Sequence, residues 1–190
     1  MAETGSEDKV ILGIDPGTHI MGYGILHVRN KHPELVHLDV LKLSANLTHP
    51  DRLKKIFEST LALIDEYLPD ELAIEAPFFG KNVQSMLKLG RAQGVAMAAC
   101  LHRSIPIFEY SPKKIKQSIT GNGNASKEQV AAMLQSILKI RKMPGNLDAT
   151  DGLAAALCHH YQRTHTRGAD GGVSGWSAFL KKNPGRIRKS

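Results

Sequence analysis

The segment from Lys9 to Thr18 constrains the fold more than any other, because it is an apolar strand that stops at a carboxylate. Apolar and β-branched residues run from Val10 to Ile14, which is typical of a central strand. Pro16-Gly17 then ends the strand with turn chemistry. Asp15 is therefore expected at the end of a core strand, where it acts either as a turn former or as a functional acid.

The remaining pattern predicts a mixed α/β domain. Extended segments are expected at 21–28 and 35–43, which form three antiparallel strands with the first, and at 71–75 and 105–110. Gly22 and Gly24 indicate positions where the backbone bends or approaches another element closely. The fourth strand ends on a second carboxylate, Glu75, just before Pro77.

Helices are expected between and after these strands. One opens at Pro50-Asp51 with Asp51 as N-cap and ends at Pro69-Asp70. The others are expected at 83–102, as a short basic helix after Ser111-Pro112, at 127–140 behind a capping box of Ser126 and Gln129, and from 148 to about 165.

Length and composition favour one domain in a reducing compartment. A chain of 190 residues suits one core domain, at 9–165, with a flexible N-terminus at 1–8 and a Gly-rich, basic and disordered tail at 166–190. Cys100 and Cys158 lie in apolar stretches without a C-x-x-C partner, as buried thiols do. No signal peptide and no run of 18 apolar residues is present, so we expect a cytoplasmic protein.

Charge is distributed unevenly along the chain. Residues 1–87 hold 8 Lys/Arg against 13 Asp/Glu, whereas residues 88–142 hold 10 against 2. Together with a net charge of +7, this asymmetry suits a polyanion such as nucleic acid, whose phosphates lie on a basic surface beside an acidic site.

The last predicted helix opens with two more carboxylates, Asp148 and Asp151. Residues three apart share a helical face, so both point the same way. Each has an ordinary alternative: Asp148 as an N-cap, and Asp151 as a first-turn acid that the helix dipole favours. Four converging carboxylates would raise one another's pKa values, and oxygen-liganded Mg²⁺ or Mn²⁺ would offset that cost.

Several motifs, in this order, resemble the ribonuclease H-like superfamily, and within it the RuvC family of bacterial Holliday junction resolvases. From about Lys9 to Arg163, the matching motifs are Gly13-Ile14-Asp15-Pro16-Gly17-Thr18, Gly22-Tyr23-Gly24, Ala73-Ile74-Glu75, Leu87-Lys88-Leu89-Gly90, Phe108-Glu109-Tyr110, Lys116-Gln117, Lys127 with Gln129-Val130, and Asp148-Ala149-Thr150-Asp151-Gly152-Leu153-Ala154.

The resemblance implies a five-stranded mixed sheet flanked by helices and a homodimer that nicks two opposed strands of a four-way DNA junction symmetrically, in recombination and repair. The acidic tetrad Asp15, Glu75, Asp148 and Asp151 would be the catalytic and metal-binding set, holding two Mg²⁺ ions, with Mn²⁺ as a substitute. RuvA and RuvB branch-migration proteins would be partners.

DNA-contacting residues are predicted on two grounds. In the resembled family an aromatic residue after the second acid stacks on a junction base, which points to Phe78 or Phe79, Phe78 aligning better; a core position is the alternative for either. Basic candidates for phosphate contacts are Lys81, Lys88, Lys113, Lys114, Lys116 and Lys127, of which Lys116 and Lys127 best match the family's DNA face.

Two further patterns concern helix packing and metal binding. Gly90, Gly94 and Ala98 form a small-residue row that predicts either tight packing on the sheet or a subunit interface. His159 and His160 are adjacent and point apart, so no metal is assigned to them.

Two other functions remain open from the sequence. Actin-like and sugar-kinase phosphotransferases also use an Asp-x-Gly-Thr turn, but they need a second phosphate loop and a second domain, which 190 residues do not supply. A noncatalytic junction-binding module would have no reason to keep four carboxylates beside a polyanion, because they oppose binding.

Overall fold

The structure is a computed structural model that describes residues 8–77 and 82–169. Its elements are β1 (Lys9–Asp15), β2 (Ile20–Arg29), β3 (His32–Lys42), α1 (His49–Tyr67), β4 (Glu71–Glu75), α2 (Val83–His102), β5 (Ile107–Tyr110), α3 (Pro112–Thr120), α4 (Lys127–Ile137) and α5 (Asp148–Ala169). The chain divides after His160 into two units, and the sheet lies in the first. The predictions for residues 1–7 and 170–190 lie outside the described residues.

The strands form one sheet in the order β3-β2-β1-β4-β5. β1 runs antiparallel to β2, and β2 antiparallel to β3, whereas β1 and β4, and β4 and β5, are parallel. The predicted five-stranded mixed sheet is confirmed. Its parallel part matters for function, because parallel neighbours bring their carboxyl ends to the same edge.

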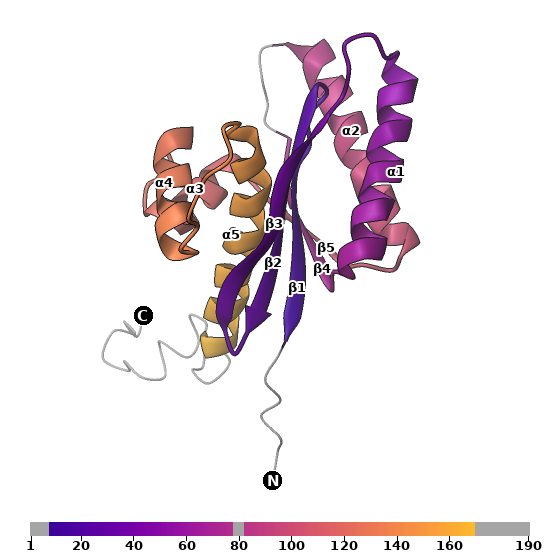
Figure 1. The fold of residues 1–190 in the computed structure, drawn as a ribbon. Helices are drawn as coiled ribbons and strands as arrows, with labels where there is room; N and C mark the ends of the chain where they lie inside the picture. Colours follow the sequence, from indigo (N-terminus) through magenta and orange to yellow (C-terminus); the bar gives the residue numbers. More distant parts are fainter. Residues whose placement is uncertain (1–7, 78–81, 170–190) are drawn as a thin grey trace, which may run out of the picture. The chain divides into compact units, whose positions relative to one another are not determined.

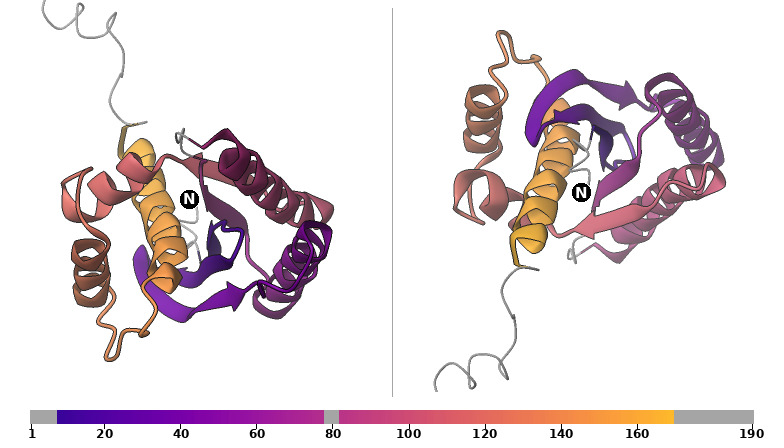
Figure 2. Two further views of the ribbon diagram at one scale, coloured as in Figure 1. Left: turned by 90° about the horizontal axis from the view of Figure 1, so that it is seen from above. Right: turned by 90° about the horizontal axis from the view of Figure 1, so that it is seen from below.

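Helices cover both faces of this sheet (Figures 1 and 2). α1 and α2 lie on one face, and α5 lies on the other with α3 and α4 beyond it. The main hydrophobic core fills the α1/α2 side with alternate residues of β1 and β4, which are Leu12, Ile14, Leu72 and Ile74, all fully buried. The residues between them in sequence therefore face α5.

Glycines let α5 lie unusually close to the sheet. A Cβ on Gly24 would lie 2.6 Å from the Cα of Leu153, and one on Gly22 would overlap the carbonyl of Asp148. Gly152 meets β2 from the helix side, where a Cβ would lie 2.6 Å from the Cα of Tyr23. The close approach predicted at Gly22 and Gly24 is confirmed, and its partner is α5.

One predicted helix start was wrong. The N-cap of α1 is Thr48, whose Oγ1 accepts a hydrogen bond from the backbone N–H of Asp51 at 3.3 Å. The helix begins at His49, earlier than predicted. Pro50 is accommodated in its first turn, where a backbone N–H would have no partner within the helix. Asp51 is instead a first-turn acid.

Other boundaries shift by a few residues. β5 begins at Ile107 because Pro106 has no N–H to donate, although its carbonyl accepts from Leu72 at 2.9 Å. α4 ends at Ile137, before Lys139 with its left-handed φ of 52°. α5 extends to Ala169. The capping box of Ser126 and Gln129 is confirmed.

Both cysteines are buried free thiols, as predicted. Among the described residues, none of the helices has the length and apolar character needed to span a bilayer.

Candidate active site

Two carboxylates meet at one edge of the sheet because their strands are parallel neighbours. Ile14 pairs with Ile74 across β1 and β4, and Asp15 and Glu75 are the next residues and the last of their strands. Both therefore face α5 at the same edge.

The turn after Asp15 has a fixed course. A Cβ on Gly17 would overlap the carbonyl of Ile20, so only glycine fits there. The guanidinium of Arg52 donates to the carbonyls of Thr18 and Ala45 at 3.3 and 2.9 Å, which ties this turn to the loop before α1. The backbone beside Asp15 is thus held from both sides.

The start of α5 supplies the other two carboxylates. Asn146 Oδ1 accepts from the backbone N–H of Asp148 at 3.0 Å, and Asp148 is the first residue of α5 and a first-turn acid. The N-cap alternative for Asp148 is thereby wrong, and its carboxylate is available to other partners. Asp151 follows in the same first turn.

One ammonium group lies against both of these acids. Lys127 Nζ is 2.9 Å from Asp148 Oδ1 and 2.6 Å from Asp151 Oδ2. Lys127 is the first residue of α4 and directly follows the N-cap Ser126, whose capping box with Gln129 fixes this helix start. The hydrogen bonds from the lysine hold the two acids of α5 beside the strand ends.

The electrostatics show that the four acids form one cluster. Burial, followed by the charge of Asp151, raises the pKa of Asp15 to about 7. Burial, followed by the charges of Asp15 and Asp151, raises the pKa of Glu75 to about 8. Burial also raises the pKa of Asp151, against the opposing hydrogen bond from Lys127.

The pKa of Lys127 moves in the complementary direction. Burial opposes its charge, but hydrogen bonds to Asp151 and Asp148 outweigh burial and raise the pKa of the ammonium. The site therefore favours added positive charge, and Lys127 is the cation that stands there.

The chemistry of this donor set fits a divalent metal ion. All four groups offer carboxylate oxygens, which suit hard cations, and a cation already lies between two of them. Within the described residues, 8–77 and 82–169, no three acidic, histidine or cysteine side chains are close enough in their present positions to share one metal ion. Binding would therefore require these side chains to rotate and the lysine to withdraw.

The predicted DNA-contacting residues fall in different places. Lys127 lies within the acidic cluster. Lys116 on α3 lies near enough that its positive charge offsets part of the rise in the pKa values of Glu75 and Asp151. Lys113 and Lys114 are exposed on α3, and Lys88 is exposed on α2, across the sheet. Phe78, Phe79 and Lys81 lie outside the described residues.

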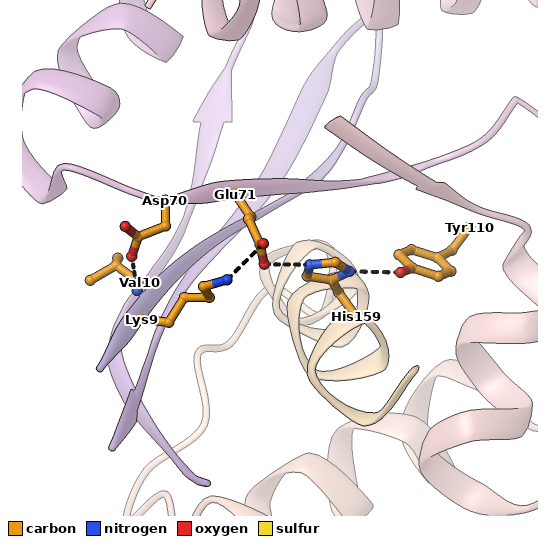
Figure 3. Close-up of polar contacts among 6 residues, drawn as sticks. All are labelled: Lys9, Val10, Asp70, Glu71, Tyr110 and His159. Atoms are coloured by element: carbon orange, nitrogen blue, oxygen red, sulfur yellow. Dashed lines mark hydrogen bonds and ion pairs between the residues drawn. The ribbon is translucent and has the colours of Figure 1, made fainter. Parts of the chain in front are cut away.

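Sequence reasoning missed a second polar cluster on the α5 face. Lys9, Glu71, His159 and Tyr110 form a hydrogen-bonded chain (Figure 3). Its signal was Glu71, which shares a strand face with Glu75 at the other end of an apolar strand.

The sheet order, the helix packed closely on it, and carboxylates from two adjoining strand ends and that helix define a ribonuclease H-like fold. The crystal structure of the yeast mitochondrial Holliday junction resolvase supports this fold class, with a TM-score of 0.59 at 15% identity over 83% of this chain and 81% of that one.

The chain belongs to the RuvC family of crossover junction endodeoxyribonucleases, whose family model matches residues 11–159. The crossover junction endodeoxyribonuclease RuvC of Christiangramia forsetii is 64% identical over 181 residues, covering 95% of this chain and 94% of the relative. That of Porphyromonas gingivalis is 58% identical over 186 residues, covering 96% and 98%. The structure of Thermus thermophilus RuvC in complex with Holliday junction substrate has a TM-score of 0.76 at 32% identity, covering 83% and 97%.

Proposed function

We propose that this chain cuts two opposed strands of a four-way DNA junction by metal-dependent phosphodiester hydrolysis at Asp15, Glu75, Asp148 and Asp151. The observation that carries the proposal is the acidic cluster itself, in which burial and then repulsion between the carboxylates raise the pKa values of Asp15 and Glu75 to about 7 and 8. Such a cluster beside basic residues suits cations and phosphates together. The T. thermophilus relative was solved with Holliday junction substrate.

The four carboxylates would hold two Mg²⁺ ions, for which Mn²⁺ can substitute. Bound ions of this kind supply activation of water and stabilise charge on the departing oxygen. The sheet fixes the backbone of the strand-end acids, and the helix packed on it fixes the backbone of the α5 acids. Only their side chains and that of Lys127 would have to move when ions bind, which limits the cost of ordering the site.

Basic residues beside the cluster would receive the DNA backbone. Lys127 is half exposed at 49%, and when cations take over the carboxylates its ammonium is free to meet a phosphate oxygen. Lys116, on the neighbouring α3, provides a second positive charge near Glu75. Lys113 and Lys114 extend this basic surface, and Lys88 is a further candidate on α2. Lys81, Phe78 and Phe79, which lie outside the described residues, stay candidates from the sequence.

Symmetric cleavage calls for two sites, and α2 offers a face for dimer formation. Cβ atoms on Gly90 and Gly94 would have no neighbour within 4 Å, so this small-residue row packs on nothing described within the chain. Exposed apolar side chains lie on the same helix, with Leu87 at 51% and Leu101 at 63% exposure. Packing on the sheet is excluded for the two glycines, and a homodimer through α2 is the remaining proposal.

The biological setting follows from this activity. A junction resolvase acts in homologous recombination and DNA repair, in the cytoplasm of a bacterial cell. We infer RuvA and RuvB branch-migration proteins as partners, from the family resemblance.

A junction-cleavage assay tests the proposal. A labelled synthetic four-way junction should be cut with Mg²⁺ and remain intact in EDTA. Glu75→Gln and Asp151→Asn should lower cleavage by at least 100-fold while still shifting the junction on a gel, because they remove ligands and leave the basic surface intact. Glu34→Gln, an exposed carboxylate on β3, is the control and should cut normally.

Full Mg²⁺-dependent cutting by the site variants would overturn the assignment of the site. Nucleotide hydrolysis without DNA cleavage would favour the phosphotransferase alternative. Junction binding without cleavage by the wild-type protein would favour the noncatalytic module.

A further inference from the structure

Four side chains from four elements form a continuous polar chain under α5 (Figure 3). Lys9 Nζ of β1 donates to Glu71 Oε1 of β4 at 2.8 Å. The other carboxylate oxygen, Glu71 Oε2, is 2.8 Å from His159 Nε2 of α5. His159 Nδ1 is 2.6 Å from the hydroxyl of Tyr110 on β5.

The centre of this series of hydrogen bonds, at His159 and Glu71, is buried, so these bonds are costly to lose. The His159 side chain is fully buried and that of Glu71 is 5% exposed. The ring of Phe108 packs on the imidazole with centroids 4.4 Å apart. Removing one partner would leave a buried polar or charged group without its bond.

Glu71 is the charged member at the centre of this arrangement. Burial opposes its charge, but the hydrogen bonds from Lys9 and His159 outweigh burial and lower the pKa of Glu71. The imidazole lies between two partners, with Nε2 at Glu71 and Nδ1 at the Tyr110 hydroxyl.

The polar chain and the acidic cluster lie on the same two elements. Glu71 and Glu75 are the first and last residues of β4 and point to the same face. His159 lies eight residues after Asp151 on α5, about 12 Å along the helix axis. Movement of α5 on the sheet at one end therefore moves the acids at the other.

The contact of α5 with β1 between these two ends is made by small residues. A Cβ on Gly13 would lie 2.8 Å from the Cβ of Ala156 and would overlap the carbonyl of Gly152. Such a surface lets the helix approach closely but offers little interlocking against sliding at β1. The hydrogen bonds of His159 therefore add to the packing of Leu153 on β2 in setting the register of the helix.

Tyr110 adds a second link to the site. Its backbone pairs with Glu75 across β4 and β5, and its carbonyl accepts from the N–H of Ala76 at 2.9 Å. The residue that holds His159 through its hydroxyl thus holds the end of β4 through its backbone.

We propose that His159, hydrogen-bonded to Glu71 and Tyr110, is a positioning residue that fixes the register of α5 on the sheet and so places Asp148 and Asp151 opposite Asp15 and Glu75. This inference rests on the proposed function, since it concerns the geometry of that same site. His159 itself does not touch substrate, and its effect is exerted through α5.

Two substitutions separate positioning from stability. His159→Leu removes both hydrogen bonds, whereas His159→Gln keeps an amide donor near the Nε2 position, toward Glu71. Ile64→Ala is the matched control, because Ile64 is 3% exposed in the core on the opposite face and its truncation costs about 2–5 kcal/mol without touching α5.

Three measurements are made on each full-length variant: thermal unfolding, junction binding in EDTA, and Mn²⁺ affinity without DNA by electron paramagnetic resonance. We expect His159→Leu to weaken Mn²⁺ binding about 10-fold, the low end of the cost of disturbing groups that orient metal ligands, because a shifted α5 would misplace Asp148 and Asp151. His159→Gln should recover most of this affinity. Ile64→Ala should lower the melting temperature while Mn²⁺ affinity and junction binding stay at wild-type values.

The outcomes are decisive in each case. Equal Mn²⁺ affinity in His159→Leu and wild type, or an equal loss in Ile64→Ala, would overturn the positioning role. If His159→Leu does not fold, Tyr110→Phe, which loses one hydroxyl, should weaken Mn²⁺ binding about threefold, and unchanged affinity would refute the inference. A wild-type protein that neither binds Mn²⁺ nor cuts junctions would instead refute the proposed function.

Discussion

Replacing Asp15 by asparagine should stabilise the protein when no metal is present, and the gain should depend on pH. The folded structure raises the pKa of Asp15 from 3.8 to about 7, through burial and then the charge of Asp151. The folded state therefore holds a proton that the unfolded chain releases. Stability from this group is fully present below pH 4 and is lost as the pH rises toward 7.

The magnitude follows from the size of that shift. A change from 3.8 to about 7 corresponds to roughly 4 kcal/mol once both states are ionised. The Asp15 edge is partly accessible to solvent, which screens charge, so we expect about 2 kcal/mol in practice. For a domain of this size, this free energy corresponds to a rise in melting temperature of about 4–8 °C.

The assay is thermal unfolding of wild type and Asp15→Asn in EDTA between pH 4 and pH 8.5. The variant should match wild type at pH 4 and melt about 4–8 °C higher at pH 8, although it should not cut DNA. Glu34→Gln is the exposed control and should follow wild type throughout. A melting difference that does not vary with pH, or a variant less stable at pH 8, would refute the electrostatic reasoning.

Three further results are expected. Mn²⁺ binding at pH 7.5 should release about one proton, shared by Asp15 and Glu75 with pKa values of about 7 and 8. Calorimetry in buffers of different ionisation enthalpy measures this release. Binding without any proton release would contradict the raised pKa values. Lys127→Met should bind Ca²⁺ roughly fivefold more tightly than wild type without DNA, because no ammonium has to leave the carboxylates. It should nevertheless cut junctions more slowly. Weaker Ca²⁺ binding in titration calorimetry would argue against displacement of the lysine by the metal ion. Gly24→Ala should lower the free energy of unfolding by about 1–3 kcal/mol in denaturant, because its Cβ would lie 2.6 Å from the Cα of Leu153. A loss under about 1 kcal/mol would show that α5 can move away freely.

The strands and their chemistry were largely predictable from the sequence because local signals carried them. Turn residues after Asp15 and Glu75 marked both strand ends, and the regular spacing of Asp148 and Asp151 put both on one face. The family resemblance implied a five-stranded mixed sheet but not the order of its strands, since nothing in apolar alternation states which strands are neighbours; the order comes from the structure. The structure supplied the parallel pairing that brings Asp15 beside Glu75.

Long-range polar contacts were not predictable by the same means. Lys127 was predicted as a phosphate contact, but its bonds to Asp148 and Asp151 join residues 21 and 24 positions apart. The sequence assigns no metal to His159, because adjacent residues such as His159 and His160 point apart. The actual partner of His159, Glu71, is 88 positions distant, and no local pattern connects the two.

The origin of the four acids in three distant parts of the chain affects when the site can form. β1 and β4 are neighbours that can pair once residues up to Glu75 are present, but α5 docks only after α2, β5, α3 and α4 have been made. A growing or proteolytically shortened chain that lacks α5 holds only two of the carboxylates. Such a fragment would have a basic surface that can bind DNA, but only half of the proposed active site. It should therefore be unable to cut the chromosome before α5 has docked on the sheet.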